Sequence, residues 1–483
     1  MSITPIGSLR NVALLSHSGS GKTSLCEAFL FNAKVITRLG KVEDGNTTSD
    51  YEPEEIKRAS SIQSSVIPCP WKQNKLNFLD TPGYDDFIGE VICALRVVEG
   101  AIIVVAAASG VEVGAERSWA MCEDGALPRF FFVNKMDREN ADFERCVEDI
   151  QSRFGRKCVP LHVTIGSQQD FQGILDLLDL PDDMPSGLNA KVATARERLV
   201  EAVAESDDEL ETRYLEEGIL TSEELSQGLK KAILSGKLVP ILAGSATMNL
   251  GVVQLMDAVN AYLPSPTTQR DSEPLTADSQ GPLAAHVFKT TADPFVGKLS
   301  FFRIYRGTFN SNSEVWNPTR NQSERVGQLF SVRGKIQEPI QEIGPGDIGT
   351  VGKLVTTVTG DSLCVRDQEI TFESIQFPVG YYTMALYPKT NADLDKMSTS
   401  IARIVEEDPT LRLSRDPDTN ETLISGLGET QVEVTTEKVR RKFGTSILLQ
   451  VPKIPYKETI TTIARGEYKH KNSPVAMDNM VTS

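Results

Sequence analysis

The stretch Ser16-His17-Ser18-Gly19-Ser20-Gly21-Lys22-Thr23 lies between an apolar run and a helical pattern. The run 12–15 predicts a strand that enters the stretch, and residues 23–31 leave it with apolar side chains at helical spacing. In a strand, loop and helix of this kind, small residues let backbone N–H groups converge on phosphate oxygens, while Lys22 supplies a cation and Thr23 a hydroxyl for Mg²⁺. The strict phosphate-loop motif begins with Gly where this chain has Ser16. The stretch alone is therefore a moderate match, and an ordinary tight turn is the alternative.

Length and composition narrow the class of protein. A chain of 483 residues predicts three or four domains, and its longest apolar run, 101–108, is far shorter than the roughly 20 residues of a membrane-spanning helix. The net charge of −16 argues against non-specific nucleic-acid binding. The seven cysteines are scattered, which predicts reduced, buried thiols and no zinc site. We expect a cytoplasmic monomer that binds neither membranes nor DNA.

Polar turns follow three further predicted strands in the first part of the chain. Strands alternate with helices from residue 1 to about 265, which is typical of a doubly wound parallel sheet. The turns 80–83 (Asp-Thr-Pro-Gly), 134–137 (Asn-Lys-Met-Asp) and 244–246 (Gly-Ser-Ala) follow the runs 75–79, 129–133 and 238–243. Because ligands bind at the carboxyl ends of strands in such sheets, these turns and the phosphate loop are expected to line one crevice.

The turn at 80–83 and the segment before it suit a bound nucleoside triphosphate. Asp80 can hold Mg²⁺ through water, and the N–H of Gly83 can sense a γ-phosphate. The polar segment 40–65 is predicted to be a mobile loop that a triphosphate orders, with Thr47, Thr48 and Ser61 as candidate Mg²⁺ ligands.

The turn at 134–137 carries base selectivity. Asn134 places an amide against one edge of a base and Asp137 a carboxylate against two donors, which suits guanine and disfavours an ATP-dependent kinase. Lys135 can lie along the base, and Ser245 and Ala246 can close the pocket with backbone groups.

These motifs in this order, followed by 251–254 (Gly-Val-Val-Gln) and 262–266 (Tyr-Leu-Pro-Ser-Pro), resemble translation elongation factor G. The stretches 284–307 and 324–363 resemble that family's second domain, a β-barrel, and their short strands separated by Gly, Asn and Pro agree. The stretches 388–390, 406–410 and 425–429 resemble its third domain. Residues 452–471 resemble the opening of its fourth domain.

The resemblance implies a multidomain α/β chain. A P-loop GTPase domain with a doubly wound sheet is expected at 1–270, with a short helical insertion at about 182–235. A β-barrel is expected at 271–375, a ferredoxin-like βαββαβ domain at 376–451, and the start of a truncated fourth domain with a tail at 452–483. In the third domain, the first helix is predicted to bury one apolar face. That face consists of Leu394, Met397, Ile401, Ile404 and Val405.

The resemblance also implies a GTP-hydrolysing translation factor that uses GTP, GDP and Mg²⁺ and acts on the ribosome, its rRNA and its proteins. The expected catalytic residues are Lys22, Asp80, Gly83 and Tyr84, and the expected metal ligands are Thr23, Ser61 and Asp80. The expected nucleotide-binding residues are Ser16, His17, Ser18, Gly19, Ser20, Gly21, Lys22, Thr23, Ser24, Asp80, Thr81, Pro82, Gly83, Tyr84, Asn134, Lys135, Met136, Asp137, Gly244, Ser245 and Ala246.

Three of the positions that depart from the family pattern lie in the nucleotide-binding part of the chain, while Thr430 and Gln431 replace an apolar-His pair in the third domain. Gly19 replaces an aspartate of the phosphate loop, and Ala59 replaces a glycine of the mobile loop, which removes backbone freedom there. Tyr84 replaces the histidine that helps to orient the attacking water, and a phenol is a poor general base at neutral pH. We therefore expect hydrolysis to be slow or ribosome-stimulated.

Two alternatives remain open at this stage. One is a ribosomal protection or recycling GTPase, which shares the first three domains. The other is a GTP-dependent ribosome-binding module with little hydrolysis, which Tyr84 and Gly19 favour.

Overall fold

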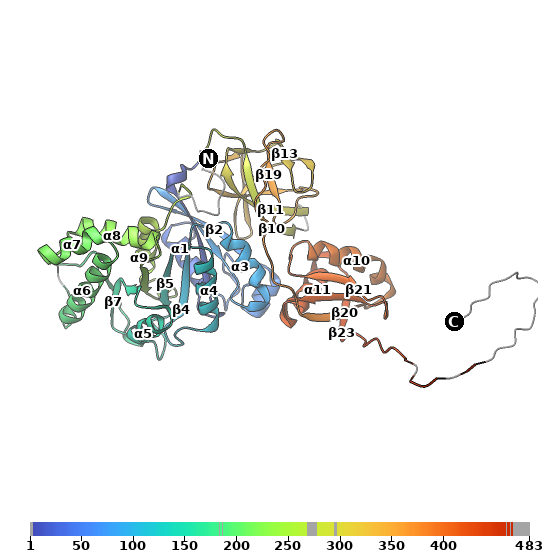
Figure 1. Ribbon diagram of the computed structural model, residues 1–483, viewed down its shortest axis with the longest axis horizontal. Coiled ribbons are helices and arrows are strands. Elements are labelled where there is room, and N and C mark those ends of the chain that lie inside the picture. The colour runs from blue at the N-terminus through green and yellow to red at the C-terminus, as the bar shows by residue number, and fades with distance from the viewer. Residues whose placement is uncertain are drawn as a thin grey trace, which may run out of the picture.

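The computed structural model describes residues 3–182, 184–185, 187–267, 278–293, 297–459, 461–463 and 465–466. Three folded units follow one another along the chain, and an extended segment leaves the third (Figure 1). The first unit carries helices and a central sheet, the second consists of strands, and the third has two helices on a small sheet.

The first unit is built on a seven-stranded sheet in the order β2-β3-β1-β4-β5-β9-β6. Every neighbouring pair is parallel except β2 and β3. The predicted doubly wound sheet is confirmed. Its strands are β1 (Leu9–Ser16), β2 (Ser65–Trp71), β3 (Asn74–Asp80), β4 (Gly100–Ala106), β5 (Arg129–Asn134), β6 (Cys158–Pro160) and β9 (Val239–Ala243).

Successive side chains of the central strands enter different cores because a strand alternates between its two faces. On β1, Val12 and Leu14 belong to one core, while Ala13 and Leu15 belong to the other. The first core lies under α1 (Lys22–Asn32), α6 (Asn189–Glu205), α8 (Ser222–Leu234) and α9 (Val252–Tyr262). The second lies under α3 (Ile88–Leu95), α4 (Val113–Asp124) and α5 (Phe143–Phe154). The remaining elements of this unit are η1 (Ile6–Ser8), α2 (Pro53–Arg58), η2 (Asp85–Phe87), β7 (His162–Ile165), η3 (Gln168–Asp170), β8 (Gly173–Asp176) and α7 (Asp208–Glu217).

The segment 40–65, predicted as a loop, contains the short helix α2. The side chains of Glu52 and Glu55 cap each other's backbone at its start, and Pro53 takes the first helical position. The helix ends at Arg58, and the next residue, Ala59, has a left-handed φ of 49°.

The second unit is an eight-stranded antiparallel sheet in the order β14-β13-β19-β10-β11-β18-β15-β16, with a separate pair β12 and β17. Its strands surround one apolar core that includes Val287, Phe302 and Leu329. The strands are β10 (Ala284–Asp293), β11 (Gly297–Arg306), β12 (Phe309–Asn310), β13 (Glu314–Asn317), β14 (Gln322–Arg325), β15 (Leu329–Arg333), β16 (Ile336–Ile340), β17 (Glu342–Ile343), β18 (Ile348–Gly352) and β19 (Ser362–Cys364).

The third unit has the predicted βαββαβ order, with both helices packed on a four-stranded sheet β21-β22-β20-β23. Met397, Ile401 and Ile404 enter its core, but Leu394 is 55% exposed. The predicted apolar face was wrong at Leu394 because the first turn of α10 extends beyond the core. The elements are β20 (Tyr382–Pro388), α10 (Asn391–Val405), β21 (Arg412–Arg415), β22 (Thr422–Gly426), α11 (Glu429–Phe443) and β23 (Ile447–Gln450).

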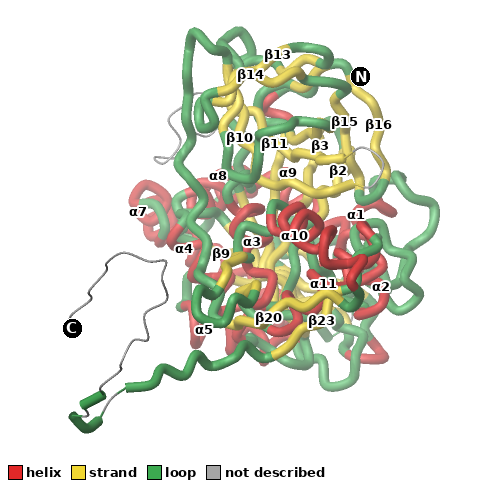
Figure 2. The backbone as a smooth tube through the Cα atoms, turned by 90° about the vertical axis from the view of Figure 1, so that its right-hand side faces the viewer, coloured by secondary structure: helices red, strands yellow, loops and turns green. Residues whose placement is uncertain are grey.

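The units contact one another through buried side chains. Ile62 of the segment before β2, Phe87 of η2 and Val434 of α11 form an apolar cluster between the first and third units. Figure 2, turned to the right-hand side of Figure 1, shows α10 and α11 in front of the first unit. Among the described residues, no helix is long and apolar enough to cross a membrane.

Candidate functional site at the carboxyl edge of the sheet

The phosphate loop joins β1 to α1 and contains two glycines with positive φ. Gly19 has φ 80° and Gly21 has φ 96°, a conformation that other residues adopt only with strain. A Cβ on Gly21 would lie 2.5 Å from Nδ2 of Asn134. Position 21 thus requires glycine both for its backbone and for its close approach to the turn after β5.

Lys22 is buried beneath this loop. Its Nζ donates a hydrogen bond to Oγ of Ser16 at 2.7 Å, so the serine that departs from the strict motif holds the lysine. A Cβ on Gly83 would lie 2.8 Å from the same Nζ. Burial lowers the pKa of Lys22 to about 8, although the carboxylates of Asp80 and Asp50 oppose this shift. A cation is therefore enclosed between the phosphate loop and the turn after β3.

The three predicted metal ligands lie together. Oγ1 of Thr23 donates to Oδ2 of Asp80 at 3.0 Å and lies 3.1 Å from Oγ of Ser61. Oδ1 of Asp80 is buried and has no hydrogen-bond partner among the described residues. Burial raises the pKa of Asp80, while Lys22 opposes the shift. All of these atoms are hard oxygen ligands, and one of them, Oδ1 of Asp80, has its acceptor capacity unused. This set of donors fits Mg²⁺.

Asp50 is a second carboxylate at this place, and the sequence analysis missed it. It is 4% exposed, and its Oδ2 also has no hydrogen-bond partner among the described residues. Burial, followed by the charge of Asp80, raises the pKa of Asp50 to about 7. Neighbouring carboxylates of this kind favour a bound cation. The available signal was an acidic residue directly after the small hydroxyl residues 47–49.

Asn134 links the phosphate loop to the turn after β9. Its Nδ2 donates to the carbonyl oxygen of Ser20 at 3.0 Å, and its Oδ1 accepts from the backbone N–H of Ala246 at 3.0 Å. Nζ of Lys135 donates to the carbonyl oxygen of Gly19 at 2.6 Å. The turns predicted from separate parts of the sequence are therefore in direct contact.

Asp137 lies at the outer side of the same group of turns. Oγ of Ser245 donates to its Oδ1 at 2.5 Å, and the backbone N–H of Met136 donates to the carbonyl oxygen of Gly244 at 3.2 Å. A Cβ on Gly244 would lie 2.4 Å from the carbonyl oxygen of Leu250.

Some predicted residues are placed to support the site through the backbone. Met136 has a fully buried side chain in the core under α3 to α5, so only its main chain faces the turns. Oγ1 of Thr81 donates to the carbonyl oxygen of Leu14 at 2.5 Å, which ties the turn after β3 to β1. Oγ of Ser20 donates to the carbonyl oxygen of His17 at 3.1 Å. The others lie on the phosphate loop, the first turn of α1 or the turn after β3, namely Ser18, Ser24 and Pro82.

Tyr84 follows Gly83 at the start of η2 and is 51% exposed. It lines a small pocket with Gly83, Gly114 and Arg117 between the turn after β3 and α4. Arg117 forms an ion pair with Asp85, the residue that follows Tyr84. Tyr84 is thus open to solvent and directly follows the glycine that approaches Lys22.

Glu27 of α1 is a further residue that the sequence analysis missed. Its carboxylate is 2% exposed and accepts hydrogen bonds from the backbone N–H of Gly40 at 2.9 Å and of Thr48 at 2.6 Å. A Cβ on Gly40 would lie 2.6 Å from Oε2 of Glu27. One side chain of α1 therefore fixes both ends of the turn that precedes Asp50. No motif identifies Glu27, because its partners are backbone groups.

The fold and the site define a P-loop nucleotide-binding protein with two further domains. Residues 7–265 match the family described as Elongation factor Tu GTP binding domain, residues 282–366 match Elongation factor G domain 2, and residues 377–451 match Elongation Factor G, domain III. The chain belongs to the elongation factor G family, and its first domain is a guanine-nucleotide-binding domain.

A protein of Thermus thermophilus with a known crystal structure is similar to this chain. The two are 30% identical and superpose with a TM-score of 0.84, and the match covers 93% of this chain and 68% of the other. The expected resemblance to elongation factor G and the expected fold class are confirmed.

Proposed function

We propose that this chain binds GTP with Mg²⁺ at the carboxyl edge of the sheet, hydrolyses it to GDP and phosphate, and acts on the ribosome as a translation factor. The observation that carries the proposal is the contact of Thr23 with both Ser61 and Asp80, within 3.1 Å. It joins the phosphate loop, the segment 40–65 and the turn after β3 at one point. A γ-phosphate bound there would contact all three.

Each part of the site has a role in this proposal. Thr23, Ser61 and Asp80, with Asp50 beside them, would hold Mg²⁺, which supplies charge neutralisation on the phosphate oxygens. Lys22 would exchange its hydrogen bond to Ser16 for one to a terminal phosphate oxygen, and the N–H of Gly83 would donate to the same group. Tyr84 would donate a hydrogen bond to the attacking water or accept one from it. Such positioning, with charge stabilisation, accounts for most of the catalysis of phosphoryl transfer.

The base side of the proposal assigns guanine selectivity to Asp137, whose carboxylate would accept two donors of the base. Asn134, Lys135 and the backbone of 244–246 would complete the pocket. Arranged in this way, the site uses the phosphate loop and the turns after β3, β5 and β9.

The remaining assignments are the domain bounds and the partners. We assign the GTP-binding domain to 1–270 with its helical insertion at about 182–235, the β-barrel to 271–375 and the ferredoxin-like domain to 376–451. Ribosomal RNA and ribosomal proteins are the proposed partners of a cytoplasmic monomer. The family membership supports these assignments.

The test is multiple-turnover GTP hydrolysis with and without purified ribosomes, together with the affinity for GDP measured by calorimetry. We expect micromolar or tighter GDP binding and turnover that ribosomes stimulate. Lys22→Ala should abolish triphosphate binding, whereas Lys34→Ala, a change at an exposed lysine just beyond the end of α1, should leave it unchanged. Equal binding of GDP and ADP by the wild-type chain would refute the proposal.

A second candidate is a guanine-nucleotide-dependent ribosome binder that hardly hydrolyses GTP. The exposed Tyr84 in place of a histidine favours it. Tight GDP binding and ribosome association without stimulated turnover would support this candidate over the enzyme.

A further inference from the structure

A lysine of the second domain lies buried between two segments of the nucleotide site. Lys289 is on β10 and is 4% exposed. Its Nζ donates to the carbonyl oxygen of Ser64 at 2.7 Å and to Oε2 of Glu90 at 2.9 Å. Ser64 directly precedes β2, and Glu90 is in the first turn of α3. The lysine therefore joins two segments that are distant in the sequence.

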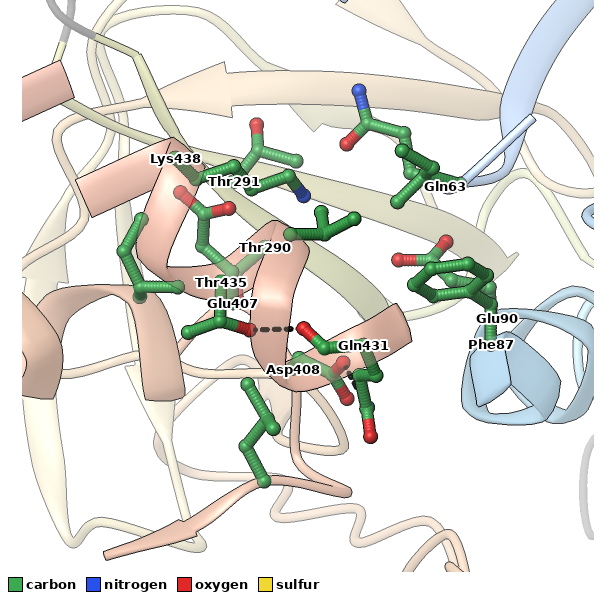
Figure 3. A pocket seen from close by; sticks show the side chains of 14 residues that line it. Gln63, Phe87, Glu90, Thr290, Thr291, Glu407, Asp408, Gln431, Thr435 and Lys438 are labelled. Carbon is green, nitrogen blue, oxygen red and sulfur yellow. Dashed lines mark hydrogen bonds between the residues drawn. The ribbon is translucent and has the colours of Figure 1, made fainter. Parts of the chain in front are cut away.

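The carboxylate of Glu90 completes this connection. Oε2 of Glu90 accepts hydrogen bonds from both the backbone N–H and Oγ of Ser64, at 2.8 Å and 2.6 Å. Burial alone would raise the pKa of Glu90, but the charge of Lys289 and the bonds from Ser64 bring it below its ordinary value. Glu90 is therefore buried as a carboxylate, and Lys289 supplies the charge that compensates for its burial. Figure 3 shows Glu90 beside Phe87, with Gln63 above them.

Both segments run directly from the nucleotide site to Lys289. The chain passes from Ser61, which contacts Thr23, to Ser64, and from Gly83, which approaches Lys22, to Glu90. If either segment moved away from the phosphate loop as a whole, the hydrogen bonds of Ser64 or Glu90 would stretch. The interdomain lysine thus fixes both segments on their far side from the phosphate loop.

The same strand holds the third domain. Oγ1 of Thr290 donates to the carbonyl oxygen of Glu406 at 3.0 Å, and the backbone N–H of Ala292 donates to Oε1 of Glu407 at 2.7 Å. A displacement of β10 at Lys289 therefore acts on the end of α10 as well.

We propose that Lys289 is a positioning residue that stabilises the arrangement of Ser64 and Glu90 required by a bound triphosphate, so that the second domain sets the preference for GTP over GDP. The inference rests on the proposed guanine-nucleotide function. It assigns part of the regulation of that site to a residue that contacts no nucleotide.

The experiment measures dissociation constants for GDP and for a non-hydrolysable GTP analogue in the full chain. Lys289→Met should weaken the affinity for the analogue about tenfold and the affinity for GDP less than about twofold, because only the triphosphate needs both segments in place. Glu90→Gln should act in the same direction. The double variant should be no worse than either single variant, since the pair acts as a unit and no unpaired buried charge remains.

Lys75→Met is the matched control. Lys75 also joins the first and second domains through a carboxylate, with Nζ at 2.8 Å from Asp347, but it lies at the opposite end of β3 from Asp80. We expect this variant to keep the wild-type ratio of the two affinities. Lys289→Arg, which keeps the charge, should restore part of the analogue affinity.

The outcomes separate the inference from the proposed function. A wild-type chain that binds neither nucleotide overturns both. Intact binding with an unchanged affinity ratio in Lys289→Met overturns the role of Lys289 alone. If Lys289→Met does not fold, the same ratio is measured in Lys289→Arg and in the double variant, and a wild-type ratio in both overturns the inference.

Discussion

Oγ of Ser245 donates a hydrogen bond to Oδ1 of Asp137 at 2.5 Å, between two turns that lie 108 residues apart in the sequence. The carboxylate assigned to the guanine edge is therefore held in place before any base arrives. Preorganisation of this kind reduces the cost of ordering the site on binding.

Asp137→Asn should change the base preference from guanine towards xanthine. The amide cannot accept from both guanine donors, but it can donate to the additional oxygen of xanthine. Two hydrogen bonds to a charged group contribute about 1.5 kcal/mol each, so GDP affinity should fall roughly 100-fold. Competitive binding of GDP and xanthosine diphosphate measures the change, with Ser245→Ala as a control that should weaken both only slightly. An unchanged GDP affinity would remove Asp137 from the base pocket.

Tyr84→His should raise ribosome-stimulated GTP hydrolysis without changing GDP affinity. Imidazole can orient the attacking water and exchange a proton near neutral pH, which a phenol does poorly. We expect an increase of about tenfold in the turnover number, less than the roughly 10²–10⁴-fold of full general acid–base catalysis, because positioning and charge supply most of phosphoryl transfer. Tyr84→Phe is the control and should lower turnover if the phenol contacts the water. A flat or reduced rate in Tyr84→His would show that water is positioned by other groups.

Arg441→Met should make α2 more accessible. The guanidinium of Arg441 at the end of α11 pairs with Glu54 at 2.8 Å and also with Glu52, which joins the third domain to the segment around Ser61. The ion pairs are partly exposed and screened, so we expect their loss to lower the free energy of local opening at α2 by about 0.7 kcal/mol. Cleavage by trypsin at Lys57 and Arg58 should then be roughly threefold faster. The difference should vanish at high salt.

The neighbouring Arg440 is exposed, and Arg440→Met serves as the matched control for this measurement. Equal cleavage rates in the two variants would show that the ion pairs do not hold α2.

His162→Asn should reduce the loss of stability on acidification. The imidazole is buried in β7, and its Nδ1 accepts from the backbone N–H of Ala243 at 3.1 Å. Burial lowers the pKa of His162 to about 4. Between about pH 6.5 and pH 4, the unfolded chain therefore binds a proton that the folded chain does not, and stability falls as the pH falls.

The contribution of His162 over that interval is at most about 3 kcal/mol. Urea unfolding of the wild type and of His162→Asn at several pH values measures it, because other titrating groups cancel in the difference. Parallel pH profiles would show that His162 is not responsible. His286, which burial also gives a pKa of about 4, should account for part of the remaining slope.

The sequence by itself determined the class of fold and the turns that form the site. Apolar runs followed by polar turns predict parallel strands with ligands at their carboxyl ends, and this rule depends only on local pattern. Lys22, Asp80, Asn134 and Ser245 were predicted to converge because each lies in a turn that follows a predicted strand. The βαββαβ order of the third domain was predicted from the resemblance to elongation factor G, which its sequence motifs carry.

Only the tertiary structure decided which other residues support those turns. Glu27 acts through backbone partners and Lys289 acts through a contact between domains, so neither has a local pattern, and the role of Asp50 follows only from its burial beside Asp80. Leu394 follows the helical period of a core face and is nevertheless exposed, because the first turn of α10 lies outside the core that buries Met397 and Ile401. Periodicity gives the direction of a side chain, but the packing of distant segments gives its surroundings.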